Sequence, residues 1–146
     1  MTRLLICLLL ALGPSLLASK PNVVVILSDD LGWGSVGCYG ANPELVSTPN
    51  IDRLRFTDAL TTSSVCSPTR YALMTGRYCW RTSLISEVLG TTAPLHIETT
   101  RITVASMLKQ QGYNCAAVGK WHLGYGTAET CDYTKELKPG PLEIGF

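Results

Sequence analysis

The chain has 146 residues, of which 46% are hydrophobic and 16% charged, and its formal net charge at pH 7 is +1. This length suits one globular domain or part of one. The near-neutral balance excludes the basic surface typical of nucleic-acid-binding proteins, so we expect no nucleic-acid partner.

The N-terminus has the layout of a secretory signal peptide. Arg3 supplies a positive charge, and an almost entirely apolar run follows over 4–12. The cleavage point is expected near Ala18 or Ser19, although a leucine lies three positions before either cut. We therefore predict a signal peptide over 1–19 and a mature segment over 20–146. The apolar run is shorter than the roughly 20 residues that a membrane span needs, and an uncleaved anchor is the alternative. The protein is expected to be exported (periplasmic, secreted or lysosomal) and to have no stable membrane span.

Two short apolar runs predict buried β-strands, over 22–27 and over 114–118. Helical patterns lie between these runs in the chain. The order strand, helix, strand predicts an α/β fold with a parallel sheet and right-handed crossovers. In such sheets ligands gather at the carboxyl ends of the strands, so the residues that follow each run are candidate site residues.

One predicted helix, the second of the chain after the one that residues 48–54 enter, covers 68–75 and ends at Gly76, since glycine tolerates the left-handed backbone of a helix end. A further helix begins after Thr103, a residue type that caps helix N-termini, and stops at Gly112. Its apolar face would be formed by Val104, Met107 and Leu108.

Polar residues follow both predicted strands. Asp29 and Asp30 follow the first, and Lys120 and His122 follow the second. Adjacent carboxylates repel each other unless a positive charge lies between them, and a hard divalent cation with oxygen ligands meets that need. A solvated acidic turn or a helix cap is the alternative for this pair. In an extended segment, Lys120 and His122 would point the same way.

Residues 66–77 read Cys-Ser-Pro-Thr-Arg-Tyr-Ala-Leu-Met-Thr-Gly-Arg. Pro68 suits the first turn of a helix, where its missing N–H costs little. A helix start offers unpaired N–H groups and the positive end of the helix dipole, and Arg70 adds a permanent charge. The segment therefore predicts an anion site that contains Cys66. A buried core thiol or half of a disulfide is the alternative for this cysteine.

Besides Cys66, four cysteines follow the predicted leader: Cys38, Cys79, Cys115 and Cys131. Four cysteines permit three pairings. Export makes disulfides possible, free buried thiols are the alternative, and the sequence favours neither.

The 66–77 segment resembles the modification motif of the type I sulfatases, the formylglycine-dependent arylsulfatase family, in which the cysteine is oxidised to formylglycine. Residues 112–124, GYNCAAVGKWHLG, resemble the second motif of that family. The resemblance extends over 21–146. It implies an alkaline-phosphatase-like α/β fold with a parallel sheet, of which this chain would be the N-terminal part.

The resemblance also implies a reaction, the hydrolysis of an aryl or carbohydrate sulfate monoester. Cys66 would become an aldehyde, and one hydroxyl of its hydrate would attack the sulfur of the ester. After the alcohol leaves, the second hydroxyl would lose its proton and expel the sulfate. A calcium ion held by Asp29, Asp30 and the modified Cys66 would activate the attacking hydroxyl. The implied partners are a sulfate-ester small molecule or sulfated glycan and a formylglycine-generating enzyme.

Three further residues receive roles from the resemblance. Arg70 would steady the formylglycine and its metal, Lys120 would contact the sulfate, and His122 would position or deprotonate the hydrate. Fixed cations stabilise the negative charge of such a transition state, and imidazole exchanges protons near neutral pH. A surface position is the alternative for each cation. His96 matches nothing and is expected to be a loop residue, and the three tryptophans are expected to be packing residues.

The chain departs from the family pattern in two places. Residues 48–54 read as a turn that leads into a helix, yet Leu54 runs directly into Arg55, where the family carries a longer helix. The chain also stops at Phe146, before further metal and sulfate ligands of the family. We therefore expect 20–146 alone to bind calcium poorly and to turn over slowly or not at all. The alternatives are a phosphonate or phosphate monoester hydrolase of the same superfamily and a truncated, non-catalytic fragment.

Overall fold

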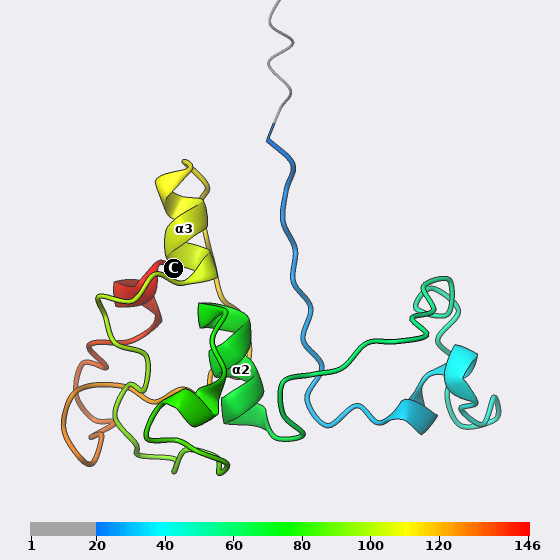
Figure 1. Cartoon of the computed structure of the whole chain (residues 1–146), viewed down its shortest axis with the longest axis horizontal. Coiled ribbons are helices and arrows are strands. Elements are labelled where there is room, and N and C mark those ends of the chain that lie inside the picture. Colours follow the sequence, from blue (N-terminus) through cyan, green and yellow to red (C-terminus); the bar gives the residue numbers. More distant parts are fainter. Residues whose placement is uncertain (1–19) are drawn as a thin grey trace, which may run out of the picture. The chain divides into compact units, whose positions relative to one another are not determined.

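A computed structural model describes residues 20–146, and the predicted signal peptide lies outside the described residues (Figure 1). The chain divides into two units, Met1–Leu31 and Gly32–Phe146. No helix among residues 20–146 is long and apolar enough to cross a membrane.

The described part of the first unit is irregular, and the predicted buried strand over 22–27 is wrong. Its side chains are exposed, with Val24 at 80% and Ile26 at 88% of full exposure. A β-branched run forms a strand only where a neighbouring strand accepts and donates its main-chain hydrogen bonds. Residues 20–146 contain no strand at all, so this run has none to pair with.

The longest helix of the second unit, α2, spans Cys66–Thr75 and begins two residues before the predicted start. Gly76 ends it as expected, with a left-handed φ of 65° and an N–H that donates to the carbonyl of Ala72. Such a conformation is accessible to glycine at low cost. One face of α2 is buried, through Ser67, Pro68, Tyr71, Ala72 and Met74.

The second α-helix, α3, spans Val104–Gln110, and its predicted cap is confirmed. The Thr103 hydroxyl accepts the N–H of Ser106 at 3.0 Å, and the Ser106 hydroxyl accepts the N–H of Thr103 at 2.8 Å. This reciprocal pair satisfies two N–H groups that the helix itself leaves unpaired. The predicted apolar face is only partly right, since Met107 is 48% exposed and Ala105 is the buried residue.

Four short 3₁₀ helices complete the regular structure of the described residues. These are η1 (Trp33–Ser35), η2 (Gly37–Tyr39), η3 (Cys79–Arg81) and η4 (Pro141–Ile144). Residues 48–54 form the expected turn, but no helix follows it.

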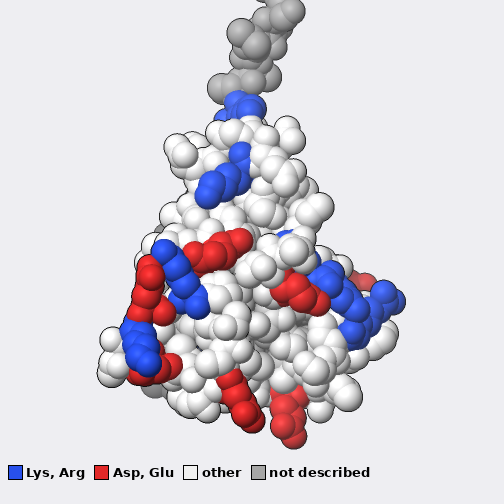
Figure 2. Space-filling model, turned by 90° about the vertical axis from the view of Figure 1, so that its left-hand side faces the viewer, with Lys and Arg blue, Asp and Glu red and all other residues white. Residues whose placement is uncertain are grey.

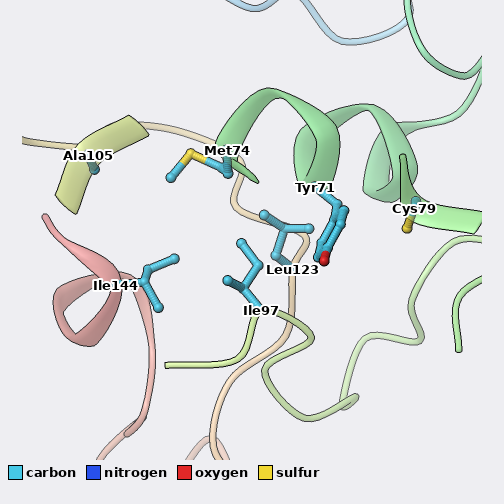
Figure 3. Packing of buried hydrophobic residues seen from close by; sticks show 7 residues of the cluster. All are labelled: Tyr71, Met74, Cys79, Ile97, Ala105, Leu123 and Ile144. Atoms are coloured by element: carbon cyan, nitrogen blue, oxygen red, sulfur yellow. The ribbon is translucent and has the colours of Figure 1, made fainter. Parts of the chain in front are cut away.

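The core of the second unit lies between α2 and the C-terminal segment (Figure 3). It is formed by Tyr71, Met74, Cys79, Ile97, Ala105, Leu123 and Ile144. The predicted strand over 114–118 contributes little to it and is also wrong: Val118 is fully exposed and the segment forms no ladder. The buried residue of this region is instead Leu123, which is 1% exposed and packs in the core.

The charged side chains are distributed as the near-neutral composition predicts. Acidic and basic side chains alternate on the face shown in Figure 2, without one extended basic patch.

Within the described part of the chain, every cysteine is a free thiol, so the structure favours free thiols over disulfides.

Candidate active site

Cys66 is the first residue of α2, where the helix leaves its N–H groups without intrahelical acceptors. Val65 occupies the cap position, and its side chain makes no capping hydrogen bond. The cysteine is half-buried, whereas the next two residues, Ser67 and Pro68, are buried against the core. The sulfur therefore lies at the positive end of a helix that is fixed by its buried neighbours.

Arg70 joins the two predicted motifs. It lies one turn after Cys66 in α2, and its Nη1 donates a 2.6 Å hydrogen bond to the main-chain oxygen of Lys120, 50 residues further along the chain. The acceptor of this hydrogen bond is a neutral main-chain carbonyl. The structure thus brings the 66–77 and 112–124 segments together without a sheet.

His122 has an unusual backbone conformation and a well-defined ring environment. Its φ is 54°, in the left-handed region that few residues other than glycine adopt. Its Nε2 lies 3.0 Å from the main-chain oxygen of Leu89. In the neutral ring this contact places the proton on Nε2, which leaves Nδ1 as an acceptor. Nδ1 is buried and has no hydrogen-bond partner among the described residues.

The left-handed turn at His122 also corrects one expectation. Lys120 and His122 were expected to point the same way because an extended segment alternates its side chains. The segment is not extended at His122, so that alternation does not hold there. Lys120 itself is exposed, while Leu123 is buried in the core.

Leu89 is a site residue that the sequence does not reveal. Its N–H donates to the Ser67 hydroxyl at 3.1 Å, and its carbonyl oxygen is the one that contacts His122. The main chain of one loop residue therefore links the start of α2 to the imidazole. No sequence pattern could identify this link, because main-chain groups are the same at every residue.

Asp29 and Asp30 lie at the end of the first unit, and both are exposed. Asp30 has a φ of 56°. Among residues 20–146, Asp30 and His122 are the only non-glycine residues with positive φ, and both are predicted site residues. Unfavourable backbone conformations of this kind cluster at functional sites. No group of three or more potential metal ligands occurs in the part of the chain that is described.

The remaining predictions near the site have mixed outcomes. His96 lies in a loop, as expected, and its Nε2 lies 2.7 Å from the Thr82 hydroxyl while its ring packs against Tyr71 in a T-shaped arrangement. Burial lowers the pKa of His96 below its ordinary value. Trp121 packs edge-on against Phe146, as expected, but Trp33 and Trp80 are 66% and 55% exposed.

Comparison with known proteins decides the family. The sulfatase family model matches residues 21–138. The chain belongs to the sulfatase family. This sulfatase chain is 43% identical over 134 residues to an N-acetylgalactosamine-6-O-sulfatase of Bacteroides thetaiotaomicron, a match that covers 88% of the chain and 26% of that protein. It is 44% identical over 125 residues to human arylsulfatase A, covering 82% of the chain and 24% of the relative.

A solved structure shows the same similarity in three dimensions. Its title refers to the metabolism of multiple glycosaminoglycans by Bacteroides thetaiotaomicron. It aligns with a TM-score of 0.79 and 42% sequence identity, and the alignment covers 87% of this sulfatase chain and 27% of the chain in that structure. The sulfatase fold of the alkaline-phosphatase-like superfamily is thereby supported, although residues 20–146 form no sheet. The chain spans about a quarter of the length of the sulfatases it matches.

Proposed function

We propose that this chain supplies the nucleophile-bearing and sulfate-binding part of an exported enzyme that hydrolyses sulfate monoesters. The observation that carries the proposal is the hydrogen bond from Arg70 to the Lys120 carbonyl, which brings the main chain of Lys120 to the side chain of Arg70 near the start of α2. The names of the relatives, an N-acetylgalactosamine-6-O-sulfatase, a human steryl-sulfatase and a human arylsulfatase A, support the same reaction class.

The proposed nucleophile derives from Cys66 after a formylglycine-generating enzyme has oxidised it to an aldehyde. The hydrated aldehyde supplies a hydroxyl that attacks sulfur and a second one that allows sulfate to leave. The position suits this role, because the helix N-terminus and the guanidinium of Arg70 favour negative charge near Cys66.

The cations and the imidazole then have separate tasks. The ester oxygens gain negative charge during cleavage, and Arg70 and Lys120 stabilise it electrostatically. His122 offers the unpartnered Nδ1 as a hydrogen-bond acceptor, while its Nε2 is held at the Leu89 carbonyl. This orientation suits a ring that positions a hydroxyl and accepts its proton.

The donor chemistry of Asp29 and Asp30 fits a calcium ion, since calcium prefers carboxylate oxygens. Calcium takes about 6–8 oxygen ligands, so two aspartates form only part of a site. When bound, the ion would supply positive charge to the attacking oxygen. We assign the two aspartates this role as a proposal, together with the modified Cys66 as a third ligand, and derive no step through the ion.

The direct test is peptide mass spectrometry across residues 63–77 on protein purified from its host. Formylglycine is expected as the mass decrease that corresponds to exchange of CH2SH for CHO at Cys66, while the peptide with Cys79 keeps its thiol mass. The enzyme of which this chain supplies a part should hydrolyse an aryl sulfate in preference to the matching aryl phosphate. An intact Cys66 thiol, in a host that modifies other sulfatases, would overturn the catalytic proposal.

A further inference from the structure

Two residues with aliphatic hydroxyl groups, Ser67 and Thr103, are buried in the part of the chain that the structure describes, at 0% and 1% exposure. A buried hydroxyl costs free energy unless it forms hydrogen bonds. The hydroxyl of Thr103 caps α3 and donates to the carbonyl oxygen of Ile144. Ser67 has no such task within its own helix, since no side chain caps α2. Its burial therefore requires another explanation.

The Ser67 hydroxyl contacts a loop that lies outside its own helix. It accepts the N–H of Leu89 at 3.1 Å, 22 residues further along the chain. Residues 82–103 form neither helix nor strand, so their main-chain groups need partners from other segments. Residues 85–88 and Gly90 are exposed, so side-chain packing holds the loop only weakly around Leu89. The hydrogen bond to Ser67 is what fixes the main chain there.

The carbonyl group of Leu89 contacts the imidazole of His122. Its oxygen lies 3.0 Å from Nε2. In a neutral imidazole, the partner of one ring nitrogen determines which nitrogen carries the proton. A carbonyl oxygen can only accept, so this contact selects the ring with its proton on Nε2. Because one residue uses both its N–H and its carbonyl, the position of the acceptor depends on the hydrogen bond to Ser67.

The second nitrogen of the ring, Nδ1, is the atom that this arrangement controls. It is buried and has no hydrogen-bond partner among the described residues. The opposite tautomer would carry its proton on Nδ1 and would have no acceptor there. The main chain at His122 is held by a φ of 54° and by the buried Leu123 that follows. The tautomer and orientation of the ring are therefore left to the contact at Nε2.

We propose that Ser67 is a positioning residue for His122 and acts through the main chain of Leu89. It holds the Leu89 carbonyl so that the imidazole keeps its proton on Nε2 and offers Nδ1 as an acceptor. The inference rests on the proposed function for the identity of the group that Nδ1 serves, the hydrated formylglycine derived from Cys66. It gives the residue after the modified cysteine a task that involves no contact with the substrate.

The test is NMR of the intact chain with 15N-labelled histidine at about pH 8, where free imidazole is neutral. The chain has two histidines, so a spectrum of the His122→Asn protein assigns both sets of signals. The protonated and the bare nitrogen of a neutral ring differ widely in 15N chemical shift, which identifies the tautomer. The unaltered protein should show His122 with its proton on Nε2 and with slowed exchange of that proton with water.

Ser67→Ala should change both observations. Leu89 lines an open cleft, so water can take up the released N–H and the carbonyl can move away from the ring. The two tautomers of His122 should then mix, and exchange of the Nε2 proton should become about tenfold faster, the effect of losing one hydrogen bond. If Ser67→Ala does not fold, Ser67→Cys replaces it, because a thiol has nearly the same shape and is a weaker acceptor.

Two control variants separate this effect from a general loss of stability. Thr103→Val removes the other buried aliphatic hydroxyl and the cap of α3, which destabilises the protein without changing a contact of Leu89. Leu89→Ala leaves the main-chain atoms of the link in place. In both proteins the tautomer of His122 should stay as it is in the unaltered chain.

A kinetic test uses the enzyme of which this chain supplies a part, with conversion of Cys66 verified by mass spectrometry in every variant. Ser67→Ala should lower kcat about tenfold and leave the KM for an aryl sulfate unchanged, because the affected hydrogen bond does not contact the substrate. In a His122→Asn protein, Ser67→Ala should lower kcat no further, since its effect passes through the imidazole. A residue that only stabilises the fold would lower kcat equally in both backgrounds.

Two results would overturn the proposal. One is an unchanged tautomer and exchange rate of His122 in the Ser67→Ala protein, and the other is an equal further loss of kcat in the His122→Asn background. The NMR measurement requires no formylglycine, so it decides on the positioning of the ring even where the mass-spectrometric test of the proposed function fails.

Discussion

The guanidinium of Arg70 donates to the main-chain oxygen of Lys120 at 2.6 Å, across 50 residues of sequence. This contact fixes the loop before His122 against the first turn of α2. A lysine at position 70 could not reproduce it together with a second contact, because an ammonium group lacks the planar, forked arrangement of donors. The side chain thus has a structural task and, in our proposal, an electrostatic one.

Arg70→Met should therefore affect both activity and stability. Loss of one donor aimed at developing negative charge typically lowers kcat by about 10²–10³-fold. A hydrogen bond from a charged group contributes about 1.5–3 kcal/mol, and partial solvent exposure should place this one at the lower end. Steady-state hydrolysis of an aryl sulfate by the enzyme of which this chain supplies a part measures the first effect, and urea unfolding measures the second.

The matched control for this change is Arg53→Met, which removes an exposed arginine elsewhere in the second unit. It should leave kcat unchanged and shift the unfolding free energy by less than about 0.5 kcal/mol. Full activity in the Arg70→Met protein would contradict the role assigned to Arg70.

His122 allows backbone strain to be separated from chemistry. Asparagine tolerates the left-handed φ of 54°, whereas valine does not. Both His122→Asn and His122→Val should lose about 10²–10⁴-fold in activity, the range for a removed acid or base. Only the valine variant should also lose about 1–2 kcal/mol of stability from the backbone. Comparable activity of the asparagine variant and the unaltered protein would show that the imidazole takes no part in the reaction.

The sequence predicts local features of this chain much better than tertiary ones. The stop at Gly76 and the cap at Thr103 are confirmed because both depend on a few adjacent residues. The strands over 22–27 and 114–118 are wrong because a strand depends on main-chain partners elsewhere, which residues 20–146 do not provide. The link from Ser67 through Leu89 to His122 was not predictable either, since two of its contacts use main-chain atoms.

Two glycines in one loop test how tightly the site is packed. Gly124 and Gly126 have similar φ values, 77° and 74°. A Cβ at Gly124 would lie 1.9 Å from the Pro94 carbonyl oxygen, whereas one at Gly126 would have its nearest contact at 3.7 Å. Gly126→Ala should therefore cost only the backbone term of about 1–2 kcal/mol. Gly124→Ala adds a clash with main-chain atoms and should cost clearly more.

The measurement for this pair is the urea-unfolding free energy of each variant at one pH. Both variants carry the same cost of placing alanine at a positive φ, so this cost cancels when their unfolding free energies are subtracted. The remaining difference measures how closely the Gly124 backbone approaches Pro94. That approach lies beside Leu123 and holds the His122 segment in place, so Gly124→Ala should also weaken hydrolysis. Equal stability of the two variants would mean that the loop can move away from Pro94 freely.

Acid should destabilise the second unit in two separate steps. Burial lowers the pKa of His96 below its ordinary value of 6.5. The unfolded chain therefore binds this proton more readily, and stability falls as the pH drops through about 6.5 until it reaches the folded-state pKa. The Arg101 hydrogen bonds lower the pKa of Glu98 from 4.5 to about 2. The ionised carboxylate therefore makes its full contribution to the stability of the folded state above pH 4.5, and this contribution is lost as the pH falls toward 2.

Urea midpoints measured from pH 8 to pH 3 should resolve the two steps because they occupy different pH windows. His96→Gln keeps a polar partner for Thr82 but cannot gain a proton, so it should abolish the step near neutral pH and leave the acidic one. Glu98→Gln should do the opposite. A near-neutral step that persists in the His96→Gln protein would assign it to another group.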